Sequence, residues 1–240
     1  MAAEEISGEG RSKGTDAQVA LLGELLEQRA ADGGLFITFE GGDGSGKTTI
    51  TRLLTAELER AGFPVVLTRE PGGTELGVEV RRLVMHGPDD VDPRTEALLY
   101  AADRAYHVAT VVRPALGENR VVLGDRYIDS SVAYQGAARQ LGTEEVRGLS
   151  LWATGGLQPD LTLYFDVDAD VGLARTGDAP DRLERSGADF HQAVREQYLA
   201  MLDQFPGRIV LVDASGTVEE TYREVVGALV ERLSGGDAAP

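Results

Sequence analysis

The chain has 240 residues and a formal net charge of −17 at neutral pH, with no cysteine. A single domain of this length can bury a sizeable core. The missing cysteine excludes disulfides, thiol catalysis and cysteine-ligated zinc, and the acidity argues against a nucleic-acid partner, whose phosphates need a basic face. Three histidines are present, and they lack the spacing of metal ligands: His86, His107 and His191.

No apolar run approaches the ~20 residues that a membrane-spanning helix needs. The acidic start of the chain, Met1–Glu5, also lacks the pattern of a signal peptide. We therefore expect a cytoplasmic protein with no membrane partner. At the other end, residues 234–240 have the composition of a disordered tail.

Residues 1–33 form a polar extension ahead of the main domain. Residues 1–15 are rich in glycine, serine and charge, so we expect disorder there. Residues 16–32 predict a helix with Asp16 as its cap, because apolar residues recur at helical spacing at Val19, Leu22, Leu25 and Leu26. Three roles are open for this helix: packing on the main domain, contact with a partner, or a remnant of an upstream domain.

Short apolar runs then alternate with longer helical segments over residues 34–233, which predicts one main domain. The predicted strands are 35–40, 65–68, 121–125, 161–166 and 209–213. The predicted helices are 48–60, 75–86, 94–117, 144–154, 189–205 and 218–233. The strands are continuous apolar runs, as in a parallel sheet covered on both faces. We therefore expect an α/β fold with three layers, a doubly wound sheet of five parallel strands, and ligands beyond the carboxyl ends of the strands.

The first predicted strand runs into Gly41-Gly42-Asp43-Gly44-Ser45-Gly46-Lys47-Thr48, which fits the phosphate-loop pattern G-x-x-x-x-G-K-[ST]. Glycines let backbone N–H groups converge on phosphate oxygens, and the helix that follows adds its positive end. Lys47, one of only two lysines in the chain, supplies a mobile charge for the β- and γ-phosphates. Thr48 offers a hydroxyl to Mg²⁺. This loop predicts binding of a nucleoside triphosphate.

Charged residues also follow the next two strands. In the turn at residues 68–74, Pro71-Gly72-Gly73 reverses the chain tightly and keeps Arg69 and Glu70 at the mouth of the site. At the end of the third strand, Asp125 suits Mg²⁺ held through water and Arg126 suits a phosphate. By themselves, Asp125 and Arg126 are better explained by a salt bridge between them at a strand end.

One predicted helix carries Tyr100 and Arg104 one turn apart on the same face. An aromatic ring and a guanidinium in that arrangement suit a nucleobase, which stacks on one and bonds to the other. Taken alone, the pair is better explained by a core tyrosine beside an arginine whose stem lies along apolar surface.

Together, these segments resemble thymidylate kinase of the bacterial type, a family of P-loop nucleoside monophosphate kinases, from Leu35 to about Leu233. The resemblance rests on four stretches in the family's order, residues 39–49, 68–74, 125–136 and 157–164. It implies transfer of the γ-phosphoryl group of ATP to dTMP, with Mg²⁺, to give dTDP and ADP in deoxynucleotide biosynthesis. It also implies a homodimer, through the helices that carry Tyr100 and residues 143–154.

The resemblance also implies the role of each site residue. The residues implied for ATP are Gly41, Gly42, Asp43, Gly44, Ser45, Gly46, Lys47, Thr48 and Thr49. Those implied for dTMP are Asp43, Arg69, Tyr100, Arg104, Arg126, Ser130, Ser131 and Tyr134. In this assignment Tyr100 stacks on thymine, and Tyr134 crowds the sugar 2′ position and favours deoxyribose. Thr48, Asp125 and Glu40 are implied around Mg²⁺ and the phosphate-binding arginine.

The lid, at about residues 174–187, departs from the family pattern. A phosphate loop without a basic residue at its variable positions is usually matched by several lid arginines, and this lid has fewer than expected. The implied catalytic cations are Lys47, Arg126, Arg175 and Arg182. We favour Arg175 as the lid cation, because Arg182 can instead pair with a neighbouring carboxylate, that of Asp181 or Glu184. The phosphate of dTMP is already ionised enough to attack, so no general base is expected.

Two other functions are compatible with the phosphate loop. The first is a kinase for another pyrimidine mononucleotide or for a deoxynucleoside, since base choice depends on small contacts. The second, from a different class, is a switch ATPase or GTPase that binds a protein partner. Against a GTPase, the guanine motif Asn-Lys-x-Asp is impossible here, because Lys13 and Lys47 are the only lysines.

Overall fold

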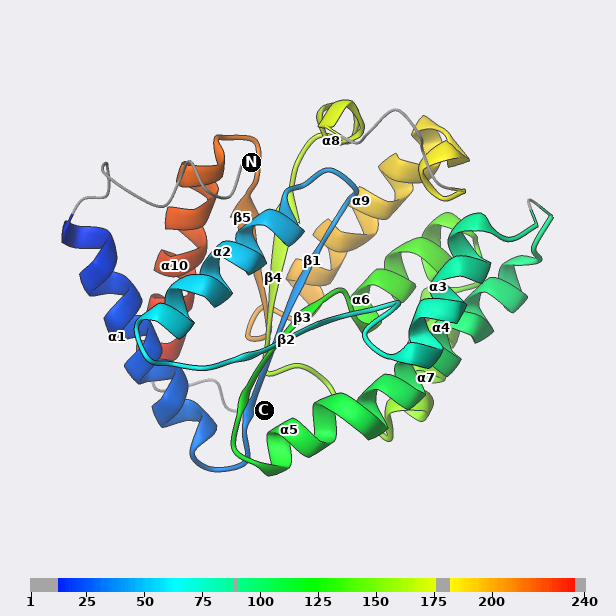
Figure 1. Cartoon of the computed structure of the whole chain (residues 1–240). Helices are drawn as coiled ribbons and strands as arrows, with labels where there is room; N and C mark the ends of the chain where they lie inside the picture. The colour runs from blue at the N-terminus through cyan, green and yellow to red at the C-terminus, as the bar shows by residue number, and fades with distance from the viewer. Residues whose placement is uncertain (1–12, 89, 176–181, 236–240) are drawn as a thin grey trace.

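The computed structural model describes residues 13–88, 90–175 and 182–235 (Figure 1). Its centre is a sheet of five parallel strands in the order β2-β3-β1-β4-β5. The strands are β1 (Leu35–Gly41), β2 (Val66–Arg69), β3 (Val121–Asp125), β4 (Leu161–Asp166) and β5 (Ile209–Asp213). The expected five-stranded α/β architecture is therefore confirmed, and each strand lies within one residue of its predicted bounds.

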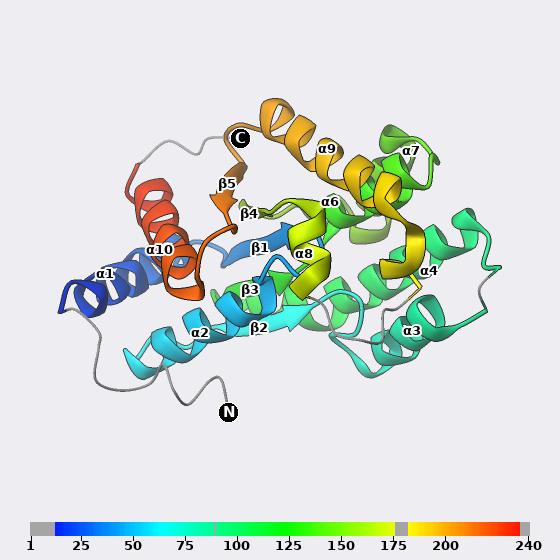
Figure 2. The same cartoon turned by 90° about the horizontal axis from the view of Figure 1, so that it is seen from above.

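Helices cover both faces of the sheet, as Figure 2 shows from above. One face is covered by α1 (Lys13–Ala30), α2 (Lys47–Arg60) and α10 (Val218–Ser234). The other is covered by α3 (Glu75–His86), α4 (Pro93–His107), α6 (Ile128–Ser131) and α9 (Ala188–Gln204), with α7 (Thr143–Thr154) packed outside them. Side chains of successive strand residues enter opposite cores: Leu35 and Ile37 pack under α2, and Phe36 packs with Tyr127 on the other side.

The parallel register brings the carboxyl ends of the strands to one edge of the sheet. Arg69 of β2 and Phe39 of β1 both pair with Asp125 of β3. Asp166 of β4 pairs with Asp213 of β5. The loops that leave these ends, including the phosphate loop after β1, therefore meet above this edge, where a doubly wound sheet binds its ligands.

The N-terminal helix differs from its predicted bounds. It already includes Lys13, so Asp16 lies inside α1 and is not its cap, and the disorder expected up to residue 15 does not extend to residues 13–15. The helix packs on the main domain, with Leu22 and Leu26 buried against α2 and α10. Its Arg29 guanidinium donates to the Leu233 carbonyl at the end of α10. The first of the three roles left open for this helix is the one observed.

Three further segments differ from the prediction. The helix expected over 94–117 is present without a gap, but its middle is π-helical: α4 leads into η1 (Val108–Val112), which leads into α5 (Arg113–Gly117). Pro114 explains this, since its ring cannot fit against the carbonyl of an α-helical turn. α6 continues into a second π-helical stretch, η2 (Val132–Ala138), which was not predicted. Also unpredicted are α8 (Ala169–Arg175) and a short 3₁₀ turn, η3 (Glu184–Ser186). Among the described helices, none is long and apolar enough to cross a bilayer.

Candidate active site

The phosphate loop has the backbone that its glycines allow. Gly44 and Gly46 adopt positive φ angles of 71° and 85°, which side chains rarely permit. A Cβ atom at Gly44 would also lie 1.9 Å from the Gly172 carbonyl oxygen. α8, which contains Gly172, therefore packs directly against the loop. Gly46 is the last residue before α2, so the N-terminus of α2 points its free N–H groups at the loop.

Lys47 folds back into the loop. Its Nζ atom donates to the carbonyl oxygens of Gly41 at 3.0 Å and Gly42 at 2.7 Å, and to the Ser45 hydroxyl at 3.0 Å. Burial, followed by repulsion from Arg126, lowers the pKa of Lys47 to about 8. The ammonium is therefore held by neutral acceptors that a phosphate oxygen can replace at little cost.

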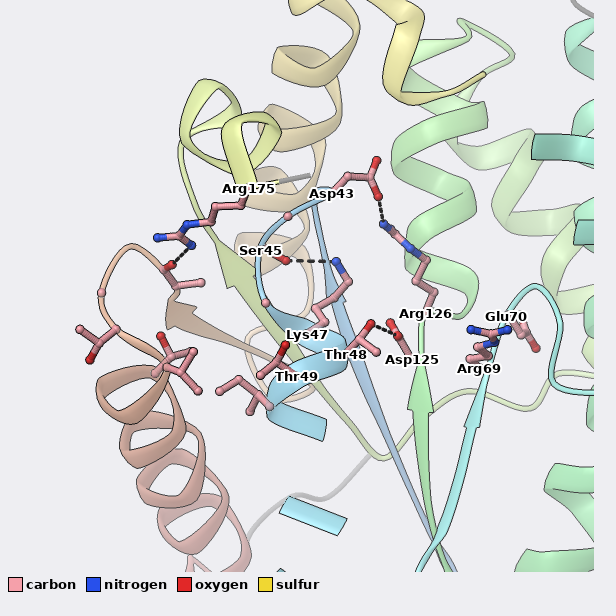
Figure 3. A pocket seen from close by; sticks show the side chains of 18 of the residues that line it. Asp43, Ser45, Lys47, Thr48, Thr49, Arg69, Glu70, Asp125, Arg126 and Arg175 are labelled. Carbon is pink, nitrogen blue, oxygen red and sulfur yellow. Dashed lines mark hydrogen bonds and ion pairs between the residues drawn. The ribbon is translucent and has the colours of Figure 1, made fainter. Parts of the chain in front are cut away.

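A hydroxyl and a carboxylate meet beside the loop. Thr48 Oγ1 donates to Asp125 Oδ2 at 2.9 Å, so the two residues sit at one corner of the site (Figure 3). Oxygen donors of this kind suit Mg²⁺, which takes one or two protein oxygens and completes its shell with water and substrate phosphates. Within the described ranges, no group of three or more acidic or histidine side chains gathers that would form an all-protein cage.

Arg126 is held tightly in an unusual conformation. Its φ angle is 69°, a left-handed conformation that costs a non-glycine residue of order 1–3 kcal/mol and is typical of functional sites. Its guanidinium pairs with Asp43 and also donates to the Gly41 carbonyl and the Ser130 hydroxyl. Burial raises the pKa of Asp43, but the nearby charges of Arg126 and Lys47 outweigh it, so the pKa is lowered overall.

A cleft of about 690 Å³ opens above the phosphate loop. Figure 3 shows four cations around it: Lys47 from α2, Arg126 after β3, Arg69 at the end of β2, and Arg175 at the end of α8. Across the loop, the first residues of α10 close the other side. Among the described residues, none pairs with the Arg69 side chain. A polyanion can therefore bind here although the protein is strongly acidic.

A smaller cavity of about 40 Å³ adjoins this cleft and shares Asp43, Glu70 and Arg126 with it. The structure brings to it five of the residues predicted to bind the acceptor nucleoside, Tyr100, Arg104, Ser130, Ser131 and Tyr134. The Tyr134 hydroxyl donates to Asp43 Oδ2 at 3.3 Å, and the Arg126 guanidinium lies 5.1 Å from the centre of the Tyr134 ring.

Arg104 is already well bound by the protein. Its Nε donates to Glu70 at 2.7 Å, and its two amino groups donate to Ser150, the Tyr127 carbonyl and Ser131. Glu70 in turn bonds to His107 at 2.8 Å. Arg104 therefore forms a rigid wall of the smaller cavity and keeps at most one N–H for a ligand.

Glu40 is completely buried and does not line the main cleft. Its carboxylate accepts hydrogen bonds from Ser130, Tyr198 and the backbone N–H of Tyr127. Burial and the nearby Asp129 carboxylate raise the pKa of Glu40. Its contacts with Tyr127 and Ser130 place it beneath Arg126, where it anchors the loop that carries this arginine. Its expected role around Mg²⁺ stays a prediction.

The two lid arginines lie in different surroundings. Arg175 lines the main cleft and donates to the carbonyls of Ala214 and Ser215. Arg182 is buried and lines neither cavity, and it donates to Glu96 at 2.6 Å and to the Val84 carbonyl at 3.0 Å. The structure thus brings Arg175 to the phosphate loop and not Arg182. Much of the expected lid, residues 176–181, lies outside the described residues, including Asp181, one of the alternative partners of Arg182.

Sequence reasoning missed several residues of the site. Arg81 of α3 lines the main cleft beside Arg69, one helical turn after Gly77. Gln135 lines the smaller cavity, and its Nε2 donates to Glu96 Oε1 at 2.8 Å. A signal was available for Glu96, because it lies one helical turn before Tyr100, on the same face of α4. Nothing local in the sequence points to Arg81.

Comparison with known proteins identifies the family of this chain. The chain matches the family model for thymidylate kinase over residues 39–225. It is 58% identical over 195 residues to the thymidylate kinase of Leifsonia xyli, covering 80% of this chain and 92% of that one. It is 45% identical over 206 residues to that of Bacillus licheniformis, covering 83% and 97%. The crystal structure of thymidylate kinase from Ehrlichia chaffeensis superposes with a TM-score of 0.70 at 31% identity, covering 82% and 99%. The resemblance found in the sequence is confirmed, and the chain belongs to the thymidylate kinase family.

Proposed function

We propose that the larger cleft holds ATP, that the smaller cavity holds the nucleoside of dTMP, and that the two phosphates meet at Arg126. As a member of its family, the protein phosphorylates dTMP to dTDP. The observation that carries the assignment is that Arg126 and Asp43 line both cavities, since these are the side chains that a donor and an acceptor phosphate would share.

The chemistry needs alignment and charge neutralisation more than covalent help. A phosphate oxygen of dTMP attacks the γ-phosphorus of ATP, the bond from that phosphorus to the β,γ-bridging oxygen breaks, and ADP leaves. Lys47 and the N-terminus of α2 bind the β- and γ-phosphates, and Arg126 with Arg69 binds the acceptor phosphate. Arg175 is the lid cation that we assign to the developing charge, because it lines the cleft that Arg182 does not reach.

Thr48 and Asp125 would hold Mg²⁺, since a hydroxyl and one carboxylate at 2.9 Å fit its preference for a few protein oxygens. Bound there, the ion would neutralise charge on the β- and γ-phosphate oxygens. In the smaller cavity, Tyr100 would stack on the base, and Tyr134 would stand near the sugar, where its ring leaves little room for a 2′-hydroxyl.

The direct test measures ADP release from ATP–Mg²⁺ with dTMP, dUMP, dCMP, dGMP and UMP as acceptors. We expect strong turnover with dTMP and little with UMP. ADP release without any acceptor would favour the partner-binding ATPase instead. Equal turnover with UMP would contradict the role of Tyr134. Lys47→Ala should abolish turnover while the circular dichroism spectrum stays that of the wild type.

We further propose a homodimer that forms through α4 and α7. These helices adjoin, and both expose large apolar side chains: Leu98 is 58% exposed and Trp152 is 82% exposed. Light scattering after gel filtration should give twice the chain mass. Trp152→Glu should yield monomers, and Leu211→Glu on the edge strand β5 is the matched control that should not. A monomeric wild type at micromolar concentration would rule the dimer out. A cytoplasmic location stays a prediction, testable by cell fractionation.

A further inference from the structure

Glu96 is a buried carboxylate that contacts Gln135, a residue that lines the smaller cavity, and none of the steps above uses it. It is 0% exposed. Its Oε2 accepts from the Arg182 guanidinium at 2.6 Å, and its Oε1 accepts from the Gln135 carboxamide nitrogen at 2.8 Å. Arg139 lies farther away, at 3.5 Å. Burying a carboxylate costs free energy, and these charged and polar partners offset that cost.

This contact determines which way the Gln135 carboxamide faces. A carboxylate paired with a guanidinium can only accept hydrogen bonds, so the amide must turn its nitrogen toward Glu96. The amide oxygen is then directed elsewhere. Gln135 is 2% exposed and lines the smaller cavity, and among the described residues no donor reaches its Oε1. An acceptor that borders a cavity and has no partner among the described residues is available to a ligand that donates a hydrogen.

We propose that Glu96 is a positioning residue for base recognition, because it holds the Gln135 carboxamide with its acceptor oxygen toward the base. The proposal rests on the placement of the base in the smaller cavity. Thymine and uracil carry a hydrogen on N3 that such an oxygen accepts. Cytosine carries a lone pair there, so two acceptors would face each other and both would stay unpaired.

A second residue that lines the cavity adds to this selection. Arg104 presents a cation, and it is held in place by Glu70 and Ser131. A cation favours the carbonyl oxygen at position 4 of thymine or uracil over the amino group of cytosine. Glu96, Tyr100 and Arg104 follow one another at intervals of four residues on one face of α4, so one helix presents the positioning carboxylate, the stacking ring and the cation.

The test compares dUMP with dCMP, which differ only at positions 3 and 4 of the base, so the methyl group of thymine plays no part. The measured quantity is the ratio of their kcat/KM values. We expect the wild type to favour dUMP by roughly a hundredfold or more, because a site built around a hydrogen bond rejects a ligand that lacks it. Glu96→Gln should lower this ratio at least tenfold, since a carboxamide at position 96 can either donate or accept and lets Gln135 turn over.

Removing the Glu96 charge leaves the buried Arg182 without its carboxylate, and the single variant can therefore misfold. A second variant, in which both charges are removed, avoids this problem. Glu96→Gln combined with Arg182→Gln replaces the ion pair with a neutral pair, and it should lower the ratio as well. Arg139→Ala is the matched control, because it removes the more distant cation and leaves the contacts of Glu96 with Arg182 and Gln135 in place, so it should keep the ratio of the wild type. Thermal unfolding checks that each variant is folded.

Gln135→Met separates the two parts of the proposal. If this variant changes neither the ratio nor the KM for dTMP, the base binds elsewhere and the proposed placement in the smaller cavity is wrong. If Gln135→Met lowers the ratio but the folded Glu96 variants keep it, the placement stands and the positioning role of Glu96 is overturned. A ratio that falls in the Gln135 and Glu96 variants, but not in Arg139→Ala, supports both.

Discussion

The Arg126 Nη2 atom lies 2.5 Å from Asp43 Oδ1, at the point where the two cavities of the site meet. The pair joins the phosphate loop to the end of β3, and both partners are partly exposed. Arg126 is thus an arginine whose fork is aimed before any ligand binds, on a backbone whose left-handed conformation costs free energy. A strained backbone of this kind is expected where an arginine must make a planar, bidentate contact with phosphate.

Arg126→Lys should therefore lower kcat/KM for dTMP by about 10²–10³-fold, although the charge is kept. A lysine cannot bridge two phosphate oxygens, and it removes the contacts to Gly41 and Ser130. Steady-state kinetics at saturating ATP give the value. Arg223→Lys, on the exposed face of α10, is the matched control and should behave as the wild type. A loss below about threefold in Arg126→Lys would show that the fork geometry is unimportant.

Lys47 predicts an alkaline limit on nucleotide binding. Its pKa is lowered to about 8, chiefly by burial, so the free enzyme should lose this charge as the pH rises through about 8. kcat/KM for ATP should then fall above pH 8. Bound phosphates favour the ammonium, so kcat should persist to higher pH. A kcat/KM profile that stays level up to pH 10 would contradict the lowered pKa.

The same shift has a consequence for stability. The folded pKa lies below the unfolded value of 10.5, so the unfolded chain binds more protons between pH 8 and 10.5. Below pH 8, Lys47 therefore lowers the free energy of unfolding by its full amount. This destabilisation diminishes as the pH rises from 8 to 10.5. Lys47→Met should remove this dependence. The difference in unfolding free energy between Lys47→Met and the wild type should shrink from pH 7 to pH 10.5, as measured by denaturant titration.

The strands and the phosphate loop could be predicted because both are local in sequence: an apolar run makes a strand, and glycines make the loop. The helix formed by α6 and η2 could not, because Ile128–Gly136 is buried on every side and shows no amphipathic period. The pairing of Arg182 with Glu96 was also beyond reach, because its partners lie 86 residues apart. The burial of Glu40 was equally beyond reach, because it depends on contacts with Ser130 and Tyr198, which lie far from it along the chain.

Arg175 and Arg182 should respond to substitution in opposite ways. Arg175→Ala should lower kcat or raise the KM for ATP by about tenfold or more, with little change in melting temperature, because this side chain borders the main cleft. Arg182→Ala should lower stability by about 3–5 kcal/mol, because it leaves the buried Glu96 carboxylate without its cation. Kinetics and thermal unfolding of both variants provide the comparison. If Arg182→Ala kept full stability and lost mainly kcat, the assignment of the lid cation would have to be reversed.

The N-terminal helix offers a test of whether a segment outside the family match is part of the folded body. The match begins at residue 39, and α1 precedes it. Leu22 is fully buried in the core shared with α2 and α10, so Leu22→Ala should lower the free energy of unfolding by about 2–5 kcal/mol.

Its neighbour Leu21 is 44% exposed on the same helix, and Leu21→Ala should change stability by less than about 0.5 kcal/mol. Both variants should keep the kinetic constants of the wild type. α1 packs against α2 and α10, but the residues of these two helices that line the cleft lie at their N-terminal ends. Urea titration of the full chain distinguishes the cases. Equal stability of Leu22→Ala and Leu21→Ala would mean that α1 contributes nothing to the fold in solution. A loss of stability in Leu22→Ala alone would identify α1 as part of the folded core.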